Sequence, residues 1–314
     1  MKSNLLILLL ILTPTIFFSQ NSNDKTIYLD SIWKETVEGN HKYYRIIKDY
    51  YSEKDNYKIY DYHKNGLLQM EGSSKTKNDL TREGEFIYYY ENGNKKQISN
   101  YKKSRLNGKQ LEWYENGDKR LEGEYIADDK TYSTELKINQ FWDTKNIQKV
   151  IDGSGYYEEI FKYFYAKGNI KNGLKDGTWE GYDKKMNYTF TETYNNSKLI
   201  SGVSIDSNKV VHNYTIAELK PIPKKGYNDF YKHVGQKFNT NKLPRGTGGK
   251  IFISFIVDKE GKITEPKIIK SVSSDADVEA LRILESYGNW NPGEIRGIKV
   301  KSKYTLPITI QTAR

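Results

Sequence analysis

The sequence predicts a mainly β protein that ends in a smaller α+β domain. Residues 84–93 (GEFIYYYENG) recur 24 positions later as residues 108–117 (GKQLEWYENG), which indicates a repeated turn-bearing unit. The 314 residues include 27 Tyr, 11 Phe and 5 Trp but only 7 Pro, a balance that favours packed sheet over disorder. The last ninety or so residues alternate strand-like runs with helical stripes, which predicts a separate α+β domain.

The chain begins with a candidate export signal. One Lys precedes a mostly apolar run at residues 5–18, and Ser19 and Gln20 follow it. The run is shorter than the roughly 20 apolar residues that span a bilayer, and a basic start with a small-residue end is typical of a secretory signal peptide. We therefore expect residues 1–20 to direct export to the periplasm. The alternative is an uncleaved segment that keeps the protein at the membrane.

Residues 21–56 are expected to form an N-terminal β segment, and residues 57–200 an array of antiparallel hairpins. Each copy of the repeat supplies aromatic strand residues and then an Asn-Gly or Lys-Gly turn, which is the pattern of a β-hairpin. A single hairpin cannot bury its own face, whereas stacked neighbours can. The array should therefore be one long meander or open solenoid.

The repeat pattern fades after residue 200, and residues 201–225, with Pro221 and Pro223, are expected to be a linker. The final domain should span residues 226–314 and open with a helix. Phe230, Val234 and Phe238 are spaced i, i+4, i+8, as a core-facing helix requires.

A hairpin and a second helix should follow. Two β-branched runs, residues 250–257 and 262–271, flank a turn that ends at Gly261, and Pro266 pushes the second strand toward an edge. Ser274 is the expected N-cap of the helix and Gly288 its C-terminal cap. Its expected apolar stripe is Val278, Ala280, Leu281, Leu284 and Tyr287.

After a predicted turn at residues 289–293, the chain should form its longest strand. One face would carry Ile298, Val300, Ser302, Tyr304, Leu306, Ile308 and Ile310, and the other Lys299, Lys301, Lys303, Thr305, Pro307 and Thr309. This alternation predicts one face on helices and one in water. A Pro and a row of Lys within a strand are typical of a sheet edge left open.

The order of these motifs resembles the TonB C-terminal domain. The motifs that carry the resemblance are Val257-Asp258, Gly261, the Glu-Ala-Leu-Arg of residues 279–282, Trp290-Asn291-Pro292-Gly293, and the strand segment from Tyr304 through Pro307 to Ile308. The resemblance implies a domain of helix, β-hairpin, helix and strand that binds a TonB-box segment of an outer-membrane receptor by strand addition. It places the partner-binding edge on Val300, Lys301, Ser302, Lys303, Tyr304, Thr305, Leu306, Ile308 and Ile310.

Residues 57–195 resemble MORN-type repeats of the YwqK-like kind. The resemblance implies an antiparallel hairpin array and names no partner for it. A typical TonB also carries a proline-rich spacer and an N-terminal anchor that couples it to inner-membrane, proton-driven motor proteins. Neither feature is visible here, so the array is a candidate substitute for the spacer.

The sequence contains no recognisable set of catalytic or metal-binding residues. The chain has no Cys, which excludes disulfides and thiolate metal sites, and its four His are scattered without metal-ligand spacing. We expect neither catalysis nor a cofactor nor a metal. Residues 226–314 carry 15 Lys and Arg against 9 Asp and Glu. Behind an export signal this charge points to acidic envelope partners or to solubility, and not to nucleic acid.

Two functions follow as hypotheses. The first is a periplasmic, TonB-like protein that binds receptor TonB-box segments in support of transmembrane transport. The alternative is a non-energised scaffold of the cell envelope that binds cell wall or other components through its β repeats. A homodimer that covers the open strand edge is a further alternative at the same surface.

Overall fold

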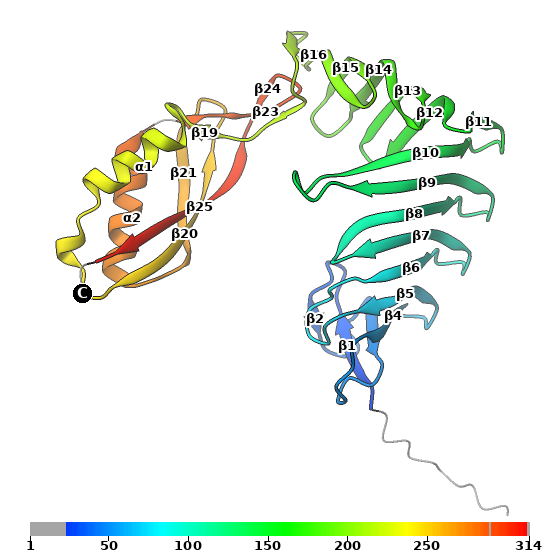
Figure 1. The fold of residues 1–314 in the computed structure, drawn as a ribbon, viewed down its shortest axis with the longest axis horizontal. Helices are drawn as coiled ribbons and strands as arrows, with labels where there is room; N and C mark the ends of the chain where they lie inside the picture. The colour runs from blue at the N-terminus through cyan, green and yellow to red at the C-terminus, as the bar shows by residue number, and fades with distance from the viewer. Residues whose placement is uncertain (1–22, 289, 313–314) are drawn as a thin grey trace, which may run out of the picture. The chain divides into compact units, whose positions relative to one another are not determined.

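The structure, a computed structural model, describes residues 23–288 and 290–312. The predicted signal peptide at residues 1–20 lies outside this range. The described chain forms two compact units, one extending to residue 136 and including residues 144–146, the other made of residues 137–143 and of those from 147 onward. The mainly β class with a C-terminal helix-and-strand region is confirmed (Figure 1). No helix in the described residues has both the length and the apolar character that a membrane span requires.

The first unit is an antiparallel meander. From β3 onward each strand pairs with the next, and β1 pairs with both β2 and β3. The strands are β1 (Lys25–Leu29), β2 (Glu35–Thr36), β3 (Tyr43–Ile47), β4 (Tyr57–His63), β5 (Leu68–Ser74), β6 (Gly84–Tyr89), β7 (Lys95–Lys102), β8 (Arg105–Trp113) and β9 (Lys119–Ala127).

The second unit holds a similar meander before its C-terminal part. Each strand again pairs antiparallel with its successor. The strands are β10 (Thr134–Trp142), β11 (Gln148–Ile151), β12 (Ser154–Phe161), β13 (Phe164–Lys171), β14 (Leu174–Asp183), β15 (Tyr188–Asn195), β16 (Lys198–Ile205) and β17 (Val211–Tyr214).

The two matching sequence copies form the same turn. The Tyr90 N–H donates to the Asn94 carbonyl at 2.8 Å, and the Tyr114 N–H donates to the Asp118 carbonyl at 2.8 Å. The last residue of each copy is a glycine, at φ +86° and +91°, in the left-handed region that other residues rarely adopt. Each copy therefore builds one hairpin with the strand that follows it, as the sequence predicts.

Aromatic rings lying over glycines hold one face of the meander together. A Cβ added to Gly72 would stand 2.4 Å from the Phe86 ring, and one added to Gly168 would stand 2.4 Å from the Trp179 ring. Phe86 and Trp179 are almost fully buried. Each ring thus occupies the space left by a missing side chain on the neighbouring strand, and apolar surface is buried there.

The C-terminal part has the predicted order of helix, hairpin, helix and strand. Its sheets run β21–β20–β25, β18–β23–β24 and β19–β22. The elements are β18 (Glu218–Leu219), β19 (Ile222–Pro223), α1 (Gly226–Lys237), a 3-10 helix (Thr240–Lys242), β20 (Gly248–Val257), β21 (Ile263–Lys270), α2 (Ser274–Tyr287), β22 (Trp290–Asn291), β23 (Gly293–Ile295), β24 (Ile298–Val300) and β25 (Ser302–Gln311).

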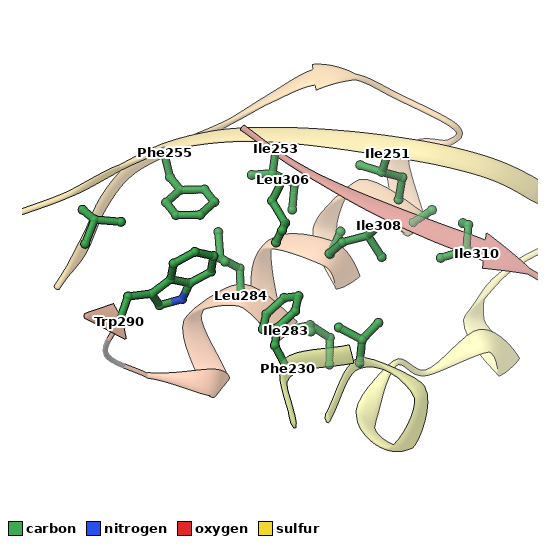
Figure 2. Close-up of a cluster of buried hydrophobic side chains, with 14 of the residues drawn as sticks. Phe230, Ile251, Ile253, Phe255, Ile283, Leu284, Trp290, Leu306, Ile308 and Ile310 are labelled. Carbon is green, nitrogen blue, oxygen red and sulfur yellow. The ribbon is translucent and has the colours of Figure 1, made fainter. Parts of the chain in front are cut away.

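Both α-helices pack on one face of the β21–β20–β25 sheet, and the core lies between them and the sheet (Figure 2). Phe230 of α1 and Leu284 of α2 are fully buried against Ile253 of β20 and Leu306 of β25. At roughly 1.5–3 kcal/mol for each large apolar side chain buried, this cluster is the main source of stability in the domain.

The N-cap and the apolar stripe of α2 differ from the prediction, whereas the C-cap is Gly288 as expected. Ser273, and not Ser274, is the N-cap, and its hydroxyl accepts the Ala276 N–H at 3.3 Å. Val278 is 68% exposed, whereas Glu279 is only 3% exposed and faces the core side. The apolar pattern of the sequence did not show which face of the helix is buried, because the charged Glu279 lies on that face. Hydrogen bonds that the sequence does not reveal hold Glu279 there.

Three short segments also differ. The predicted turn at residues 289–293 contains β22 and the start of β23, and the predicted final strand is interrupted at Lys301 between β24 and β25. Residues 201–225, where a linker was expected, include most of β16 and all of β17, β18 and β19. These short strands exist because β18 pairs with β23 and β19 with β22, partners that lie about seventy residues further along the chain.

Candidate functional site

β25 lies at the edge of its sheet. It pairs with β20 without interruption, from Gly248↔Gln311 to Val257↔Ser302, and no described strand pairs with its other side. The position of the strand thus agrees with the edge that the sequence predicts. β21, which contains Pro266, lies at the opposite edge.

The predicted edge residues fall on more than one element. Val300 ends β24, Lys301 lies between strands, and the residues from Ser302 to Ile310 lie on β25. Along β25 the side chains of Leu306, Ile308 and Ile310 are buried under the helices, and the intervening side chains are exposed. The buried side chains hold the strand in place, and the open side of the strand presents its backbone groups.

Pro307 shows which backbone groups face outward. It stands opposite Phe252 and has no N–H, so this pair cannot exchange both ladder hydrogen bonds. In an antiparallel ladder the N–H and C=O of one residue point to the same side of the strand, and those of the next residue point to the opposite side. The outward-facing groups therefore belong to Lys303, Thr305, Pro307 and Thr309, while Tyr304 and the other buried residues bond to β20.

Trp290 packs against the first part of the edge strand β25. Its ring lies 5.1 Å from that of Phe255, 5.6 Å from that of Tyr304 and 6.0 Å from that of Phe230, centroid to centroid (Figure 2). The backbone N–H of Trp290 donates to the Gly261 carbonyl at 2.8 Å. A Cβ on Gly261 would stand 1.9 Å from the Trp290 carbonyl oxygen, so this position requires glycine.

The rest of that motif shapes the bend before β25. Asn291 pairs with Ile222 in the β19–β22 ladder. A Cβ on Gly293 would stand 2.4 Å from the Ser302 hydroxyl oxygen and 3.2 Å from the Leu219 carbonyl oxygen, so the chain can pass here only as glycine. Trp290, Asn291, Pro292 and Gly293 thus have structural positions and present no reactive group.

A tyrosine cluster joins α1 to the edge strand. The hydroxyls of Tyr227 and Tyr304 lie 2.6 Å apart, and the Tyr231 hydroxyl donates to the Pro307 carbonyl at 3.3 Å. Burial, followed by the hydrogen bond with Tyr304, raises the pKa of Tyr227 well above its ordinary value. The Tyr227 phenol therefore stays neutral at physiological pH and acts as a hydrogen-bonding group.

A hollow of about 290 Å³ adjoins the start of β25. Its apolar lining comes from Leu219, Pro221, Ile295, Val300 and Tyr304. Glu218, Glu294, Lys220 and Lys303 carry the charges around it, and Ser302 and Thr305 complete it. The hollow places a small apolar recess directly beside the outward backbone groups of Lys303 and Thr305.

A second contact, which sequence reasoning missed, joins the β23–β24 turn to the last strands of the meander. Arg296, at the tip of the turn, bonds Glu192 of β15 through Nε at 2.8 Å and through Nη2 at 3.3 Å. Its guanidinium lies 3.8 Å from the centroid of the Phe190 ring. The Ser204 hydroxyl donates to the Arg296 carbonyl at 2.7 Å, and the Arg296 N–H donates to the Ala217 carbonyl at 2.6 Å.

Glu192 is 2% exposed and serves as the centre of this contact. It also accepts the hydroxyls of Tyr194 at 2.9 Å and Tyr214 at 2.8 Å. Burial lowers the pKa of Arg296, but the hydrogen bond and charge of Glu192 outweigh it and raise that pKa overall. The contact is a fully paired buried ion pair, and it fixes the C-terminal domain to β15 within the second unit.

The described residues contain no group of three or more His, Asp or Glu side chains placed to hold a metal ion. His41 and His63 lie on the first unit, His212 on β17 and His233 on α1.

The comparisons with known proteins agree with this description for the C-terminal part alone. Residues 241–310 match the family model of the Gram-negative bacterial TonB protein C-terminal domain. The matched range begins before β20 and ends within β25, so it contains the edge strand and the Trp290 motif. A search of curated proteins finds no match to the chain.

Proposed function

We propose that the protein is a TonB-like component of the cell envelope whose C-terminal domain binds TonB-box segments of outer-membrane receptors by strand addition, in support of transport. The family match at residues 241–310 supports a TonB-type domain, and this family is one of non-catalytic transducers. The observation that carries the proposal is the unpaired side of β25. An extended peptide can add there through main-chain hydrogen bonds.

The residues predicted for this role are Val300, Lys301, Ser302, Lys303, Tyr304, Thr305, Leu306, Ile308 and Ile310. Their parts in it would differ. Lys303, Thr305 and Thr309 would offer backbone groups to the guest, while Tyr304, Leu306 and Ile308 hold the strand against the helices. The charge of Lys301 is offset by Glu265, whose carboxylate lies 3.3 Å away.

The proposal is tested with the full chain and synthetic receptor TonB-box segments. The double variant Thr305→Pro/Thr309→Pro removes two outward N–H groups and leaves the β20 ladder in place. The matched control Thr305→Val/Thr309→Val changes the same side chains and keeps both N–H groups. Titration calorimetry is expected to show binding by the unaltered chain and the control, and at least a tenfold loss in the Pro variant, since each lost hydrogen bond contributes about 0.5–1.5 kcal/mol. Equal binding by all three proteins rules out strand addition.

A second candidate function is a non-energised scaffold that binds cell-wall or other envelope material through its repeats. One observation favours it. A hollow of about 370 Å³ on the second unit's meander is lined by Tyr165, Tyr182, Lys167 and Glu180, and the two tyrosine rings lie 5.6 Å apart. Exposed aromatic rings beside paired charges can stack on a sugar. Retention on peptidoglycan that is lost in Tyr165→Ala/Tyr182→Ala and kept in Tyr163→Ala would support this function.

A further inference from the structure

The open side of β25 is divided at Pro307. The proline offers no N–H, and the Tyr231 hydroxyl of α1 donates to its carbonyl at 3.3 Å. A guest strand therefore meets no donor at this position, and the carbonyl there already accepts one hydrogen bond. The outward groups fall into two sets, those of Lys303 and Thr305 before the proline and those of Thr309 and Gln311 after it.

The first set adjoins a recess. The hollow of about 290 Å³ includes Ser302, Lys303, Tyr304 and Thr305 in its lining and no residue beyond Pro307. Its volume is at the lower end of the roughly 300–1,000 Å³ of ligand pockets, which leaves room for a bulky side chain. The guest's side chains alternate in direction, so every second one could enter a recess beside the edge.

The lining of the hollow defines the chemistry of that side chain. Leu219, Ile295 and Val300 make the recess apolar. Around it the carboxylates of Glu218 and Glu294 balance the ammonium groups of Lys220 and Lys303. A rim with no net charge does not attract one sign of peptide over the other, so apolar burial is the selective interaction.

We propose that β25 recognises its guest through a short window, Ser302 to Thr305, and that the guest is an extended peptide with one bulky apolar side chain seated in the adjoining hollow. This inference rests on the proposed function. It adds the part of the strand that binds the guest and the type of guest side chain that is recognised. The window supplies two N–H and two C=O groups, from Lys303 and Thr305. Specificity comes from the recess.

The window is tested by moving one proline along the strand. Thr305→Pro removes an outward N–H inside the window, and Thr309→Pro removes the equivalent N–H beyond it. The probe is a synthetic seven-residue peptide of alternating Thr and Val with Phe at its centre, labelled with fluorescein, and binding to the full chain is measured by anisotropy. We expect Thr305→Pro to weaken binding by about two- to tenfold, the effect of one lost hydrogen bond, and Thr309→Pro to leave it nearly unchanged.

Other outcomes separate this inference from the proposed function. A loss in Thr309→Pro equal to that in Thr305→Pro overturns the window and leaves strand addition at β25 standing. Failure of the unaltered chain to bind the Phe peptide overturns the inference, and the receptor-segment titration then decides the proposed function alone. Concentration-dependent dimers that Thr305→Pro converts to monomers would show that the occupant is a second copy of the chain, and would overturn the peptide assignment.

The recess is tested separately, with the same peptide carrying Ala in place of Phe. Burial of a Phe side chain predicts that the unaltered chain prefers the Phe peptide by about tenfold or more. Leu219→Trp fills the recess and should abolish this preference while leaving the affinity for the Ala peptide within twofold. Ile269→Trp, at an exposed position on β21, is the matched control and should keep the preference. Equal affinity of the unaltered chain for both peptides overturns the role of the recess.

Discussion

Arg296 is the residue on which the contact between the meander and the C-terminal domain depends. Its guanidinium and the Glu192 carboxylate are 15% and 2% exposed as side chains, so each neutralises a charge that water cannot reach. Loss of one partner of such a pair leaves the other unpaired in a medium of low polarity. The phenols of Tyr194 and Tyr214 would then be the only remaining partners of Glu192 among those described above.

Arg296→Ala is expected to destabilise the second unit by about 3–5 kcal/mol, the usual cost of breaking a buried ion pair. Lys301→Ala breaks an ion pair whose side chains are 58% and 67% exposed, and is expected to cost at most about 1 kcal/mol. Urea unfolding followed by tryptophan fluorescence measures both. Hydrogen exchange should localise the loss to the strands around Glu192. Similar losses in the two variants would contradict the buried ion pair.

Glu279 is the charged residue that α2 turns toward the core. Its carboxylate accepts the Asn239 N–H at 2.8 Å and bonds Arg282 at 2.6 and 3.0 Å. The Arg282 hydrogen bonds, with help from the Asn239 N–H, lower the pKa of Glu279 despite its burial. A carboxyl whose pKa is lowered by folding stabilises the fold above its ordinary pKa of about 4.3 and loses this effect as pH falls.

Glu279→Gln is therefore expected to lower the free energy of unfolding at pH 7 by about 1.5–3 kcal/mol, the range for hydrogen bonds to charged groups. It should also flatten the fall in stability between pH 5 and pH 3. The exposed Glu285 of the same helix offers a matched control, since Glu285→Gln should leave the free energy at pH 7 nearly unchanged. Denaturant unfolding at a series of pH values checks both expectations.

At the scale of elements, the strands of the meander depend on glycines as much as on aromatics. The ring of Trp179 lies where a side chain on the adjacent strand would project from Gly168. The repeat copies in the sequence show both residue types but not which glycine meets which ring. That pairing follows from the register, in which Gly168 stands opposite Trp179.

Gly168→Ala should destabilise the second unit by about 1–3 kcal/mol, because the added methyl overlaps the Trp179 ring and forces strand or ring to move. Gly235→Ala in α1 is the opposite case. A Cβ there meets no atom within 4 Å, and Ala is the better helix former by about 0.8–1 kcal/mol, so this change should stabilise the protein. Thermal unfolding of the two variants should move in opposite directions, and a shift in the same direction would refute the packing argument.

The periodicity of the elements explains what the sequence could and could not predict. The β20–β21 hairpin, α1 and the edge strand were predictable, since a period of two or of 3.6 is a local property of the chain. The buried face of α2 was predicted wrongly because the charged Glu279 is buried, held by Arg282 of the same helix and by the Asn239 N–H. The strands β18, β19 and β22 are two residues each and show no period at all.

At the scale of the whole molecule, the tyrosines link stability to alkaline pH. Burial, and then hydrogen bonding or charge from Tyr101 or Glu192, raises the pKa of Tyr88, Tyr194 and Tyr214 above the ordinary value of about 10. A group whose pKa is raised by folding contributes its full stability below the unfolded pKa and loses it as pH rises toward the folded pKa. Ionisation of these tyrosines should therefore cost the protein no stability below about pH 10.

Urea unfolding is accordingly expected to be nearly independent of tyrosine ionisation up to about pH 9.5 and to weaken steeply above pH 10. Phenolate absorbance near 295 nm should rise later in the folded protein than in the chain unfolded in urea. Coincident titration curves for the two states would contradict the burial of these phenols.

The candidate site was predictable in its location but not in its detail. The alternation along residues 298–310, with its proline and lysines, was enough to place an open edge on the last strand. The division of that edge was hidden, because it requires Tyr231 on α1 to meet Pro307 on β25, and these are 76 positions apart. The ion pair of Arg296 with Glu192 spans 104 positions and left no mark in the sequence.

Pro307 has one more consequence, which concerns solubility. An exposed strand edge is a template on which copies of a chain can stack into fibrils, since every unpaired amide offers the next copy a hydrogen bond. A continuous ladder between two copies of β25 would have to cross a position without an amide hydrogen, with Lys303 and its charge close by. Pro307 and the nearby lysine are therefore expected to oppose edge-to-edge aggregation of the protein.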